Sequence, residues 1–234
     1  MTRTVLWIFA AVFVWLGVVV FAPFALAESD WTQSKWGPAD EIGSANYVTP
    51  ERVVRAAQLV KTGKLYRLGA VTSAATPAFP PREYKIHVWE QAIASSNKIT
   101  YTDDMVTAWL GVGSQIDGFG HIGVDHVHYN GNKAGDFVTM TGLTKFGVEN
   151  IPPLVARGVL LDMTQHYGAE IVPDGTVFGP AEIEAAAKRQ GLSIREGDVV
   201  IFHSGWLKRF LENPPDTETG IFPEPGPGVA GARH

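Results

Sequence analysis

The apolar positions after Thr49 recur with the spacing of one face of an α-helix. They are Val53, Val54, Ala57, Leu59 and Val60. Thr49 is a residue type that caps helices, and Pro50 suits the first helical position because that position needs no free N–H. The pattern therefore predicts a helix that opens at Pro50 and ends by Gly63.

Two apolar runs later in the chain lie on either side of a second predicted helix. Residues 155–163 and 199–202 are short, apolar and bounded by polar or turn-forming residues, as buried strands are. Between them, Gly179-Pro180 opens a helix over residues 181–190 that Gly191 ends. Strand, helix and strand in this order predict an α/β arrangement with at least one crossover connection.

The other segments have weaker patterns. Residues 64–69, 86–89 and 94–104 have the composition of strands and long loops, with prolines at 77, 80 and 81 between them. Prolines at 214, 215, 223, 225 and 227 predict a loop, and the following 229–234 resemble a first helical turn, too short to be stable alone. This ending indicates either a frayed tail or a fragment of a longer polypeptide.

The N-terminus has the pattern of an export signal. Arg3 precedes an apolar stretch over residues 5–27, and Ala25-Leu26-Ala27 is an A-x-A cleavage sequence. We expect residues 1–27 to be a signal peptide and residues 28–234 to be the mature domain. The stretch is long enough that an uncleaved membrane anchor is the alternative. Either way the folded part is expected to be exported, to the periplasm or beyond the cell.

The amino-acid composition limits the partners and the chemical groups that the protein can use. With 234 residues, 45% apolar and 18% charged, the chain is expected to form one globular domain. The net charge of −5 and the scattered Lys and Arg residues argue against a nucleic-acid partner and leave small-molecule substrates open. The absence of cysteine excludes disulfides and thiolate chemistry. Any metal ion must therefore be bound by His, Asp, Glu, Asn or Gln.

Residues 113–131, GSQIDGFGHIGVDHVHYNG, are the candidate site. If residues 110–117 are extended, Gln115 and Asp117 project from one face, and the bend allowed by Gly118 and Gly120 brings His121 toward them. A carboxylate, an amide oxygen and an imidazole suit Mn²⁺, Zn²⁺ or Fe²⁺. In the alternative, Asp117 caps the next turn and His121 is a hydrogen-bonded loop residue. A helix here is disfavoured, because each interior glycine costs about 1 kcal/mol.

The remaining polar candidates carry weaker signals. His126 and His128 are predicted to lie on a solvated loop edge, and His203 to be a satisfied histidine at a strand end, with a pocket-lining role as its alternative. The histidines at 87, 166 and 234 are predicted to be structural or at the surface. Ser114 and Ser204 are not in a G-x-S-x-G nucleophile elbow, and the chain has no phosphate-binding loop motif.

Four ordered blocks resemble the cyclase or kynurenine formamidase-like family of metal-dependent hydrolases. They are residues 36–69, 113–131, 151–163 (IPPLVARGVLLDM) and 192–206 (LSIREGDVVIFHSGW). Together they span most of the mature chain. The resemblance implies a swivelling β/α/β-type domain of the α/β class, with a mixed, barrel-like sheet and flanking helices.

The metal motif of that family, H-x-G-T-H-x-D-x-P-x-H, aligns with residues 111–121. Its aspartate falls on Asp117 and its last histidine on His121. Its first two histidines fall on Gly111 and Gln115, and its proline on Phe119. The change removes two imidazoles, so the resemblance implies Mn²⁺ at least as readily as Zn²⁺. The family's distal histidine and glutamate have no counterpart here, which implies a C-terminally truncated member.

The resemblance implies an exported, metal-dependent hydrolase of an amide or of a cyclic amide or ester, similar to arylformamidases. A metal-activated water would attack the carbonyl. Asp117, Gln115 and His121 would bind the metal, with His121 and Gln115 also in catalytic roles. Three aromatic residues, Trp109, Phe119 and Trp206, are candidates for the substrate wall, with core packing as the alternative. Homo-oligomers are expected of the full-length protein.

Two other hypotheses stay open. The first is a non-catalytic, exported protein that binds a small molecule in the family pocket, and the loss of two imidazoles favours it. The second is a serine hydrolase that uses Ser114, whose activity would survive removal of metal ions.

Overall fold

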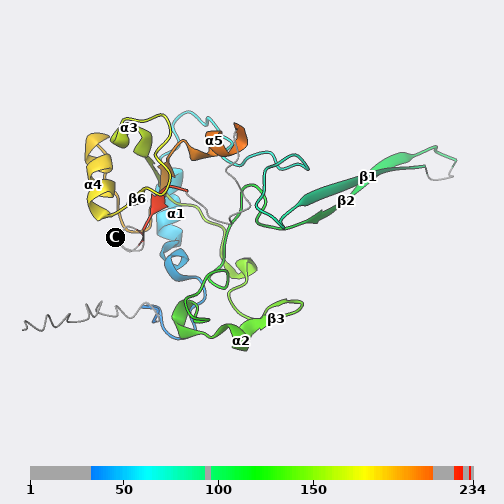
Figure 1. Ribbon diagram of the computed structural model, residues 1–234, viewed down its shortest axis with the longest axis horizontal. Helices are drawn as coiled ribbons and strands as arrows, with labels where there is room; N and C mark the ends of the chain where they lie inside the picture. The colour runs from blue at the N-terminus through cyan, green and yellow to red at the C-terminus, as the bar shows by residue number, and fades with distance from the viewer. Residues whose placement is uncertain (1–32, 93–95, 213–223, 229–231, 233–234) are drawn as a thin grey trace, which may run out of the picture. The chain divides into compact units, whose positions relative to one another are not determined.

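The computed structural model describes residues 33–92, 96–212, 224–228 and 232 (Figure 1). The chain divides into two compact units, residues 1–31 and Thr32–His234, and the described residues all belong to the second. The predicted signal peptide or anchor at residues 1–27 and the prolines at 214, 215 and 223 lie outside the described residues. No described helix has the length and apolar character needed to cross a membrane.

The helix predicted at Thr49 is confirmed as α1, Pro50–Ala57. The Thr49 side chain accepts a hydrogen bond from the backbone N–H of Arg52, and Pro50 begins the helix. The helix ends earlier than predicted, because turn-type bonds to the carbonyls of Ala56 and Ala57 replace the helical pattern. None of the eight described residues of α1 is buried.

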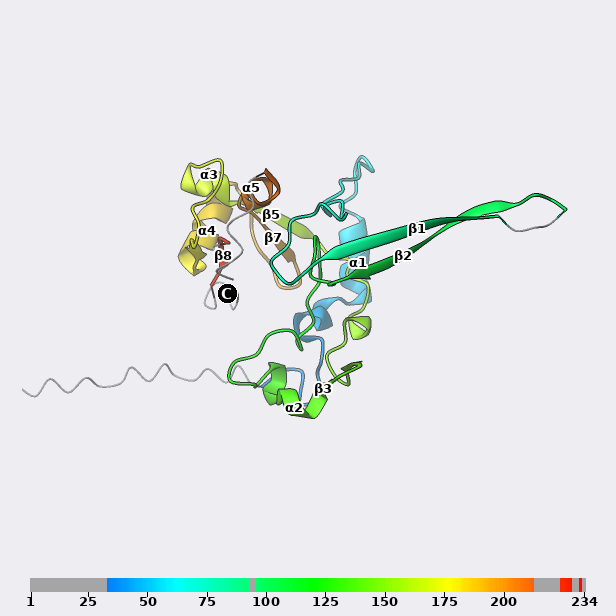
Figure 2. The same ribbon diagram turned by 45° about the vertical axis from the view of Figure 1, so that its right-hand side comes forward.

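The predicted strand, helix and strand are confirmed as a parallel crossover unit. Strand β5, Gly158–Asp162, pairs in parallel with β7, Val199–His203, and the connection carries α3, Met163–Tyr167, and α4, Pro180–Arg189. Figure 2 shows the two strands side by side with α3 and α4 next to them. Gly191, at φ +64°, closes α4 in the left-handed conformation that glycine adopts at little cost.

The apolar core lies between this parallel pair and α4. Its buried members are Val159, Leu161, Met163, Val172, Phe178, Ile183, Ala186 and Ala187. Leu161 and Met163 are fully buried, whereas Leu160 is 54% exposed, so β5 buries alternate residues of the apolar run 155–163.

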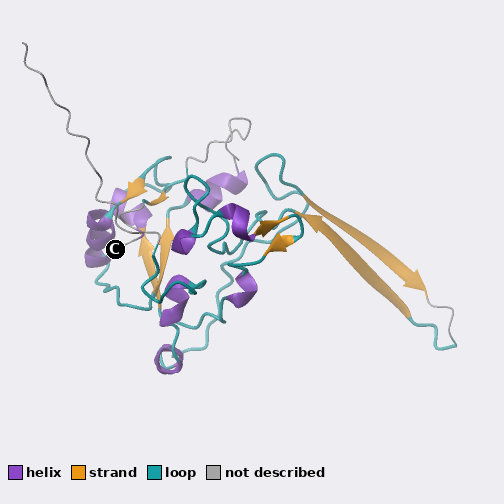
Figure 3. Cartoon of the chain, turned by 90° about the horizontal axis from the view of Figure 1, so that it is seen from below, coloured by secondary structure: helices purple, strands orange, loops and turns teal. Residues whose placement is uncertain are grey.

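Two other strands form a long antiparallel hairpin, β1, Tyr84–Ala92, with β2, Thr100–Ala108 (Figure 3). These strands overlap the segments predicted at 86–89 and 94–104. Most described side chains of the hairpin are exposed, including Ile86 and Val106. Residues 64–69, for which strands and long loops were predicted together, are irregular in the structure and correspond to the loop part of that prediction.

Short elements complete the described fold. Helices α2, Ala134–Phe137, and α5, Trp206–Glu212, are accompanied by the 3-10 turns Gly43–Tyr47, Tyr129–Gly131 and Val148–Asn150. The pair β3, Val138–Thr139, with β4, Gly142–Leu143, is antiparallel, and β6, Val177–Phe178, with β8, Gly226–Pro227, is parallel. The pairing of Gly226–Pro227 corrects the loop predicted for that part of the proline-rich segment.

The α/β class is therefore confirmed, and the sheet prediction only in part. Both parallel and antiparallel pairings occur, but in the described residues they form four separate two-stranded sheets. No closed barrel is present among these residues, so the barrel-like, swivelling sheet is not confirmed.

Candidate functional site

A turn after β2 leads into the candidate loop, residues 113–131. Strand pairing ends at Ala108, and the backbone N–H of Val112 then donates to the carbonyl of Trp109, 3.1 Å away, in a turn. Gly113 follows at φ +83°, a conformation that favours glycine. The extended conformation expected for residues 110–117 is therefore wrong in its first half, where residues 110–114 form a turn and bend.

Gln115 and Asp117 nevertheless lie together, as their spacing predicted. The Gln115 amide nitrogen donates to both Asp117 carboxylate oxygens, at 3.1 and 3.0 Å. Both side chains are exposed. The geometry places the NH₂ group of Gln115, rather than its oxygen, against the carboxylate.

The space beside Gly111 is occupied by two polar groups. A Cβ at this position would lie 2.7 Å from Gln115 Oε1 and 2.8 Å from Arg82 Nη1. Such distances are too short for any side chain without displacement of its neighbours. Arg82 thus brings a positive charge beside Gln115, and sequence reasoning missed this residue because it precedes the site by about thirty positions.

The following glycines let the loop pack directly on the segment around β4. A Cβ at Gly118 would lie 2.5 Å from the Phe146 carbonyl oxygen, and a Cβ at Gly120 would lie 2.7 Å from Leu143 Cδ1. A larger residue at 118 would require a backbone shift, and one at 120 would have to displace the Leu143 side chain. The glycines fix the path of the loop by close contact, in addition to permitting a bend.

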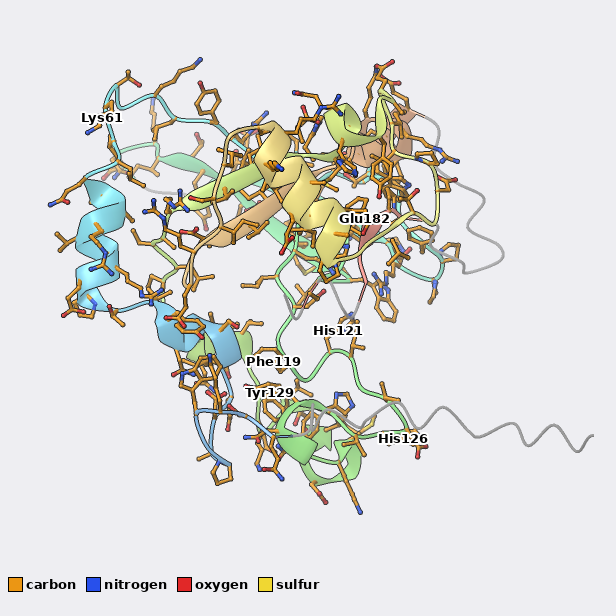
Figure 4. The ribbon with its side chains drawn as sticks, turned by 90° about the vertical axis from the view of Figure 1, so that its left-hand side faces the viewer. Lys61, Phe119, His121, His126, Tyr129 and Glu182 are labelled. Atoms are coloured by element: carbon orange, nitrogen blue, oxygen red, sulfur yellow. The ribbon has the colours of Figure 1, made fainter. Side chains whose placement is uncertain are left out.

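His121 lies on the turn that these glycines make. Its backbone N–H donates to the Gly118 carbonyl, 3.0 Å away, and its side chain is exposed. Figure 4 places His121 further along the same loop as Phe119, with His126 beyond it. The imidazole at this point is therefore accessible to solvent and to a ligand.

Phe119 is held by aromatic packing. Its ring stacks on Tyr129 with centroids 4.0 Å apart and an interplanar angle of 14° (Figure 4). A Cβ at Gly43 would lie 2.6 Å from the Phe119 ring. The Tyr129 hydroxyl in turn donates to Asp40, 2.6 Å away. Phe119 is 37% exposed, so part of its ring remains accessible.

Asp40 anchors this part of the loop and was not found from the sequence. Besides Tyr129, its carboxylate accepts from the Ser34 hydroxyl and the Asn46 amide, each at 2.7 Å. Burial raises the pKa of Asp40, but these hydrogen bonds and one from the Ile42 N–H outweigh burial and hold the pKa below its ordinary value. The available signal was the run of Asp, Ser and Asn at residues 40–46.

The two later histidines of the segment differ from each other. His126, at φ +61°, is exposed on a turn, as predicted for a solvated loop edge. His128 is only 9% exposed and packs its ring edge-on to Phe137, so the prediction is wrong for this residue. The physical reason is the antiparallel bridge from Val124 to Val127, which turns the chain inward after His126.

The two tryptophans predicted to bind substrate lie in different surroundings. Trp109 is 52% exposed, at the end of β2. Trp206 is 8% exposed and stacks on Phe210. The structure therefore places Trp206 in packing, as the core alternative anticipated. Trp109 is accessible to a ligand.

A second polar pair lies at the carboxyl ends of the parallel strands. His203 Nδ1 lies 3.2 Å from Asp162 Oδ1, and Asp162 also caps α3. Burial raises the pKa of Asp162, but hydrogen bonds from Thr164, His203 and Gln165 lower it well below its ordinary value. The prediction of a satisfied histidine at a strand end is confirmed.

The residues of the loop do not fit a metal ion as they are arranged. The described residues hold no group of three or more His, Asp or Glu side chains placed to bind one. The Gln115 amide presents hydrogens to Asp117, where a shared cation would need an oxygen. The guanidinium of Arg82 beside Gln115 adds a like charge.

Comparison with known proteins assigns the chain to a family. A family model described as "Putative cyclase" matches residues 28–234, and the chain belongs to this cyclase family. The predicted family resemblance is thus confirmed. A solved structure described as that of a novel cyclase is similar, with a TM-score of 0.72 and 28% sequence identity. The match covers 85% of this chain and 71% of that one. No curated protein matched.

Proposed function

We propose that this cyclase-family protein is a hydrolase that cleaves an amide bond, or a cyclic amide or ester bond, in a small molecule, in the manner of arylformamidases. The observation that supports it best is the Asp117 carboxylate, held by two hydrogen bonds from Gln115 on a glycine-built loop. These hydrogen bonds fix the side-chain conformation of Asp117, so the carboxylate is already oriented for proton transfer.

The chain's own groups can divide the work of hydrolysis. Asp117 is exposed and keeps lone pairs that Gln115 does not use, so it can accept a proton from an attacking water. His121, exposed on the next turn, can give a proton to the leaving nitrogen. Trp109 and the exposed part of Phe119 offer aromatic surface to an aryl substrate.

Dependence on a divalent ion, Mn²⁺ or Zn²⁺, is a separate part of this proposal. The oxygen and nitrogen donors of Asp117, Gln115 and His121 are suited to such ions. In the structure, however, these three side chains are not arranged around a shared metal position. The mechanism above therefore uses no metal ion. Export through residues 1–27 and assembly into a homo-oligomer also remain proposals.

A second candidate function is binding without catalysis. Gly111 and Gln115 replace two imidazoles of the family motif, and Arg82 Nη1 lies within 3 Å of the position that a Cβ at residue 111 would take. A guanidinium is a good partner for a carboxylate-bearing ligand and a poor neighbour for a cation.

Turnover of an aryl formamide by the purified full chain tests the proposal. We expect Asp117→Ala to lower kcat/KM by at least about 100-fold, the scale of a lost acid–base group. Asp136→Ala, which removes an exposed carboxylate from α2, is the matched control and should leave kcat/KM unchanged. Metal content measured by mass spectrometry, with and without added Mn²⁺ or Zn²⁺, tests the separate metal part.

Three results would contradict this proposal, either in its reaction or in its mechanism. Aryl ligands that bind without turnover would favour the binding protein. Turnover that Asp117→Ala leaves intact would remove the proposed base. Turnover that survives chelation but disappears in Ser114→Ala would favour the serine hydrolase.

A further inference from the structure

A cavity of about 410 Å³ lies between α1 and the segments that lead into the two parallel strands. Its most prominent feature is a set of four arginines, contributed by all three segments: Arg52, Arg55, Arg157 and Arg195. Two acidic residues, Glu196 and Asp198, also line it. Four positive and two negative side chains leave a local charge of +2, in a protein whose net charge is −5.

Two of the four arginines are fixed by the acidic residues. Arg157 makes a forked pair with Asp198, at 2.9 Å from Nε and 2.5 Å from Nη2, and the Asp198 side chain is only 7% exposed. Arg52 donates to both the side chain and the carbonyl of Glu196. Its guanidinium lies where a Cβ at residue 197 would be, so the glycine there is needed for this contact.

The other two arginines keep their hydrogen-bonding groups free. Neither the Arg55 nor the Arg195 guanidinium makes a hydrogen bond or ion pair with another residue of the described chain. Arg195 has a fixed backbone, since its N–H donates to Asp198, 2.7 Å away. The cavity thus combines two arginines that build its wall with two that have unused donors.

We propose that this cavity binds a phosphate group, as free phosphate or as a small phosphomonoester. Each guanidinium can donate two parallel hydrogen bonds to a phosphate, and several can share one dianion because its oxygens are equivalent. The volume is within the range of small-molecule sites. Ala56, Leu59 and Ala156 add apolar wall that an organic phosphate would cover.

This site is separate from the proposed hydrolytic loop. No residue of 113–131 is among those that line the cavity, which belong to α1 and to the chain before β5 and β7. Failure of the hydrolase proposal would therefore leave the phosphate site untouched, and the reverse also holds.

Isothermal titration of the full chain with inorganic phosphate, at low ionic strength, tests the site. We expect saturable binding of one phosphate, weakened at least tenfold in the double variant Arg55→Ala/Arg195→Ala. The matched control is Arg67→Ala, which removes an exposed arginine outside the cavity and should not change the dissociation constant. A second titration with phenyl phosphate distinguishes the sources: tighter binding than inorganic phosphate indicates an organic ligand.

Three outcomes would overturn the proposal. One is the absence of saturable phosphate binding to the unsubstituted chain. Another is equal binding by the double variant, which would place phosphate elsewhere. The third is equal weakening by Arg67→Ala, which would show that phosphate binding responds to the overall positive charge and not to these two arginines. The melting temperature without phosphate should be the same in all variants, because the replaced side chains make no hydrogen bond to described residues. If the double variant melts lower, the single variants Arg55→Gln and Arg195→Gln replace it, and unchanged binding in both refutes the site.

Discussion

Removal of the Tyr129 hydroxyl should measure how firmly the candidate loop is anchored. Tyr129→Phe keeps the ring that stacks on Phe119 and deletes one O–H donor to Asp40, at 2.6 Å. A hydrogen bond to a charged group contributes about 1.5–3 kcal/mol. Asp40 is partly exposed and keeps its bonds from Ser34 and Asn46, so water can replace the lost donor in part. We therefore expect a loss near the lower limit, about 1.5 kcal/mol in the free energy of unfolding.

Asp40→Asn should cost more than Tyr129→Phe. The amide offers one acceptor oxygen in place of two, and its NH₂ group faces donors such as the Asn46 amide. At least two hydrogen bonds are lost, so we expect a destabilisation of about 2–4 kcal/mol. Because the two residues share a contact, the double variant should lose less than the sum, with a coupling of about 1 kcal/mol.

Urea unfolding followed by circular dichroism measures these differences. Tyr66→Phe is the control, since Tyr66 is 70% exposed and should change stability by less than about 0.5 kcal/mol. Equal stability of Tyr129→Phe and Tyr66→Phe, or strict additivity of the double variant, would refute the anchoring role of Asp40.

Three further predictions concern packing, pH and the family motif. Gly120→Ala should destabilise the fold by about 1–3 kcal/mol in urea unfolding, because the new methyl group would overlap Leu143; an unchanged midpoint would show that the loop yields freely. Asp162, whose folded pKa is depressed, stabilises the protein fully above its unfolded pKa of about 4 and loses this effect progressively as the pH falls from there toward its folded pKa. In Asp162→Asn, the free energy of unfolding should therefore fall less steeply as the pH is lowered below about 4. The same slope in the variant and the unsubstituted protein would contradict this prediction. Gly111→His should lower the melting temperature without raising Zn²⁺ or Mn²⁺ affinity by titration, since Gln115 and Arg82 occupy the space; tight new metal binding would contradict this.

The part of the fold that the sequence predicts well is the part with local signals. Thr49 and Pro50 mark the start of α1, and Gly191 marks the end of α4. The apolar runs of β5 and β7 are short and bounded by polar or turn-forming residues, and alternate positions of each run contribute to the core. Each of these signals acts within a few residues, so no tertiary information is needed.

The hairpin shows why the other strands were harder to predict. Its residues are mostly exposed on both faces, so apolar and polar positions need not alternate. Its register is set by nine cross-strand pairs, from Tyr84 with Ala108 to Ala92 with Thr100. The apolar and polar pattern along one strand does not show which residues of the other strand it pairs with.

The same distinction between local and long-range signals applies to the candidate site. The proximity of Gln115 and Asp117 followed from their spacing of two. The contacts of Asp40 with Tyr129 and of Arg82 with the space at Gly111 join segments far apart in sequence. Such long-range contacts have no signature in composition or periodicity, so only the fold shows them.

Gly111 has a packing role that the family motif alone would hide. By alignment it is a missing histidine, and a missing ligand would leave a vacant space. In the structure, that space holds the Gln115 oxygen and the Arg82 guanidinium. The glycine at 111 and the glutamine at 115 are therefore physically linked: the first makes room for the second, whose nitrogen then orients Asp117. A site built in this way uses hydrogen bonds to hold the carboxylate, which is the function that a bound cation would otherwise serve.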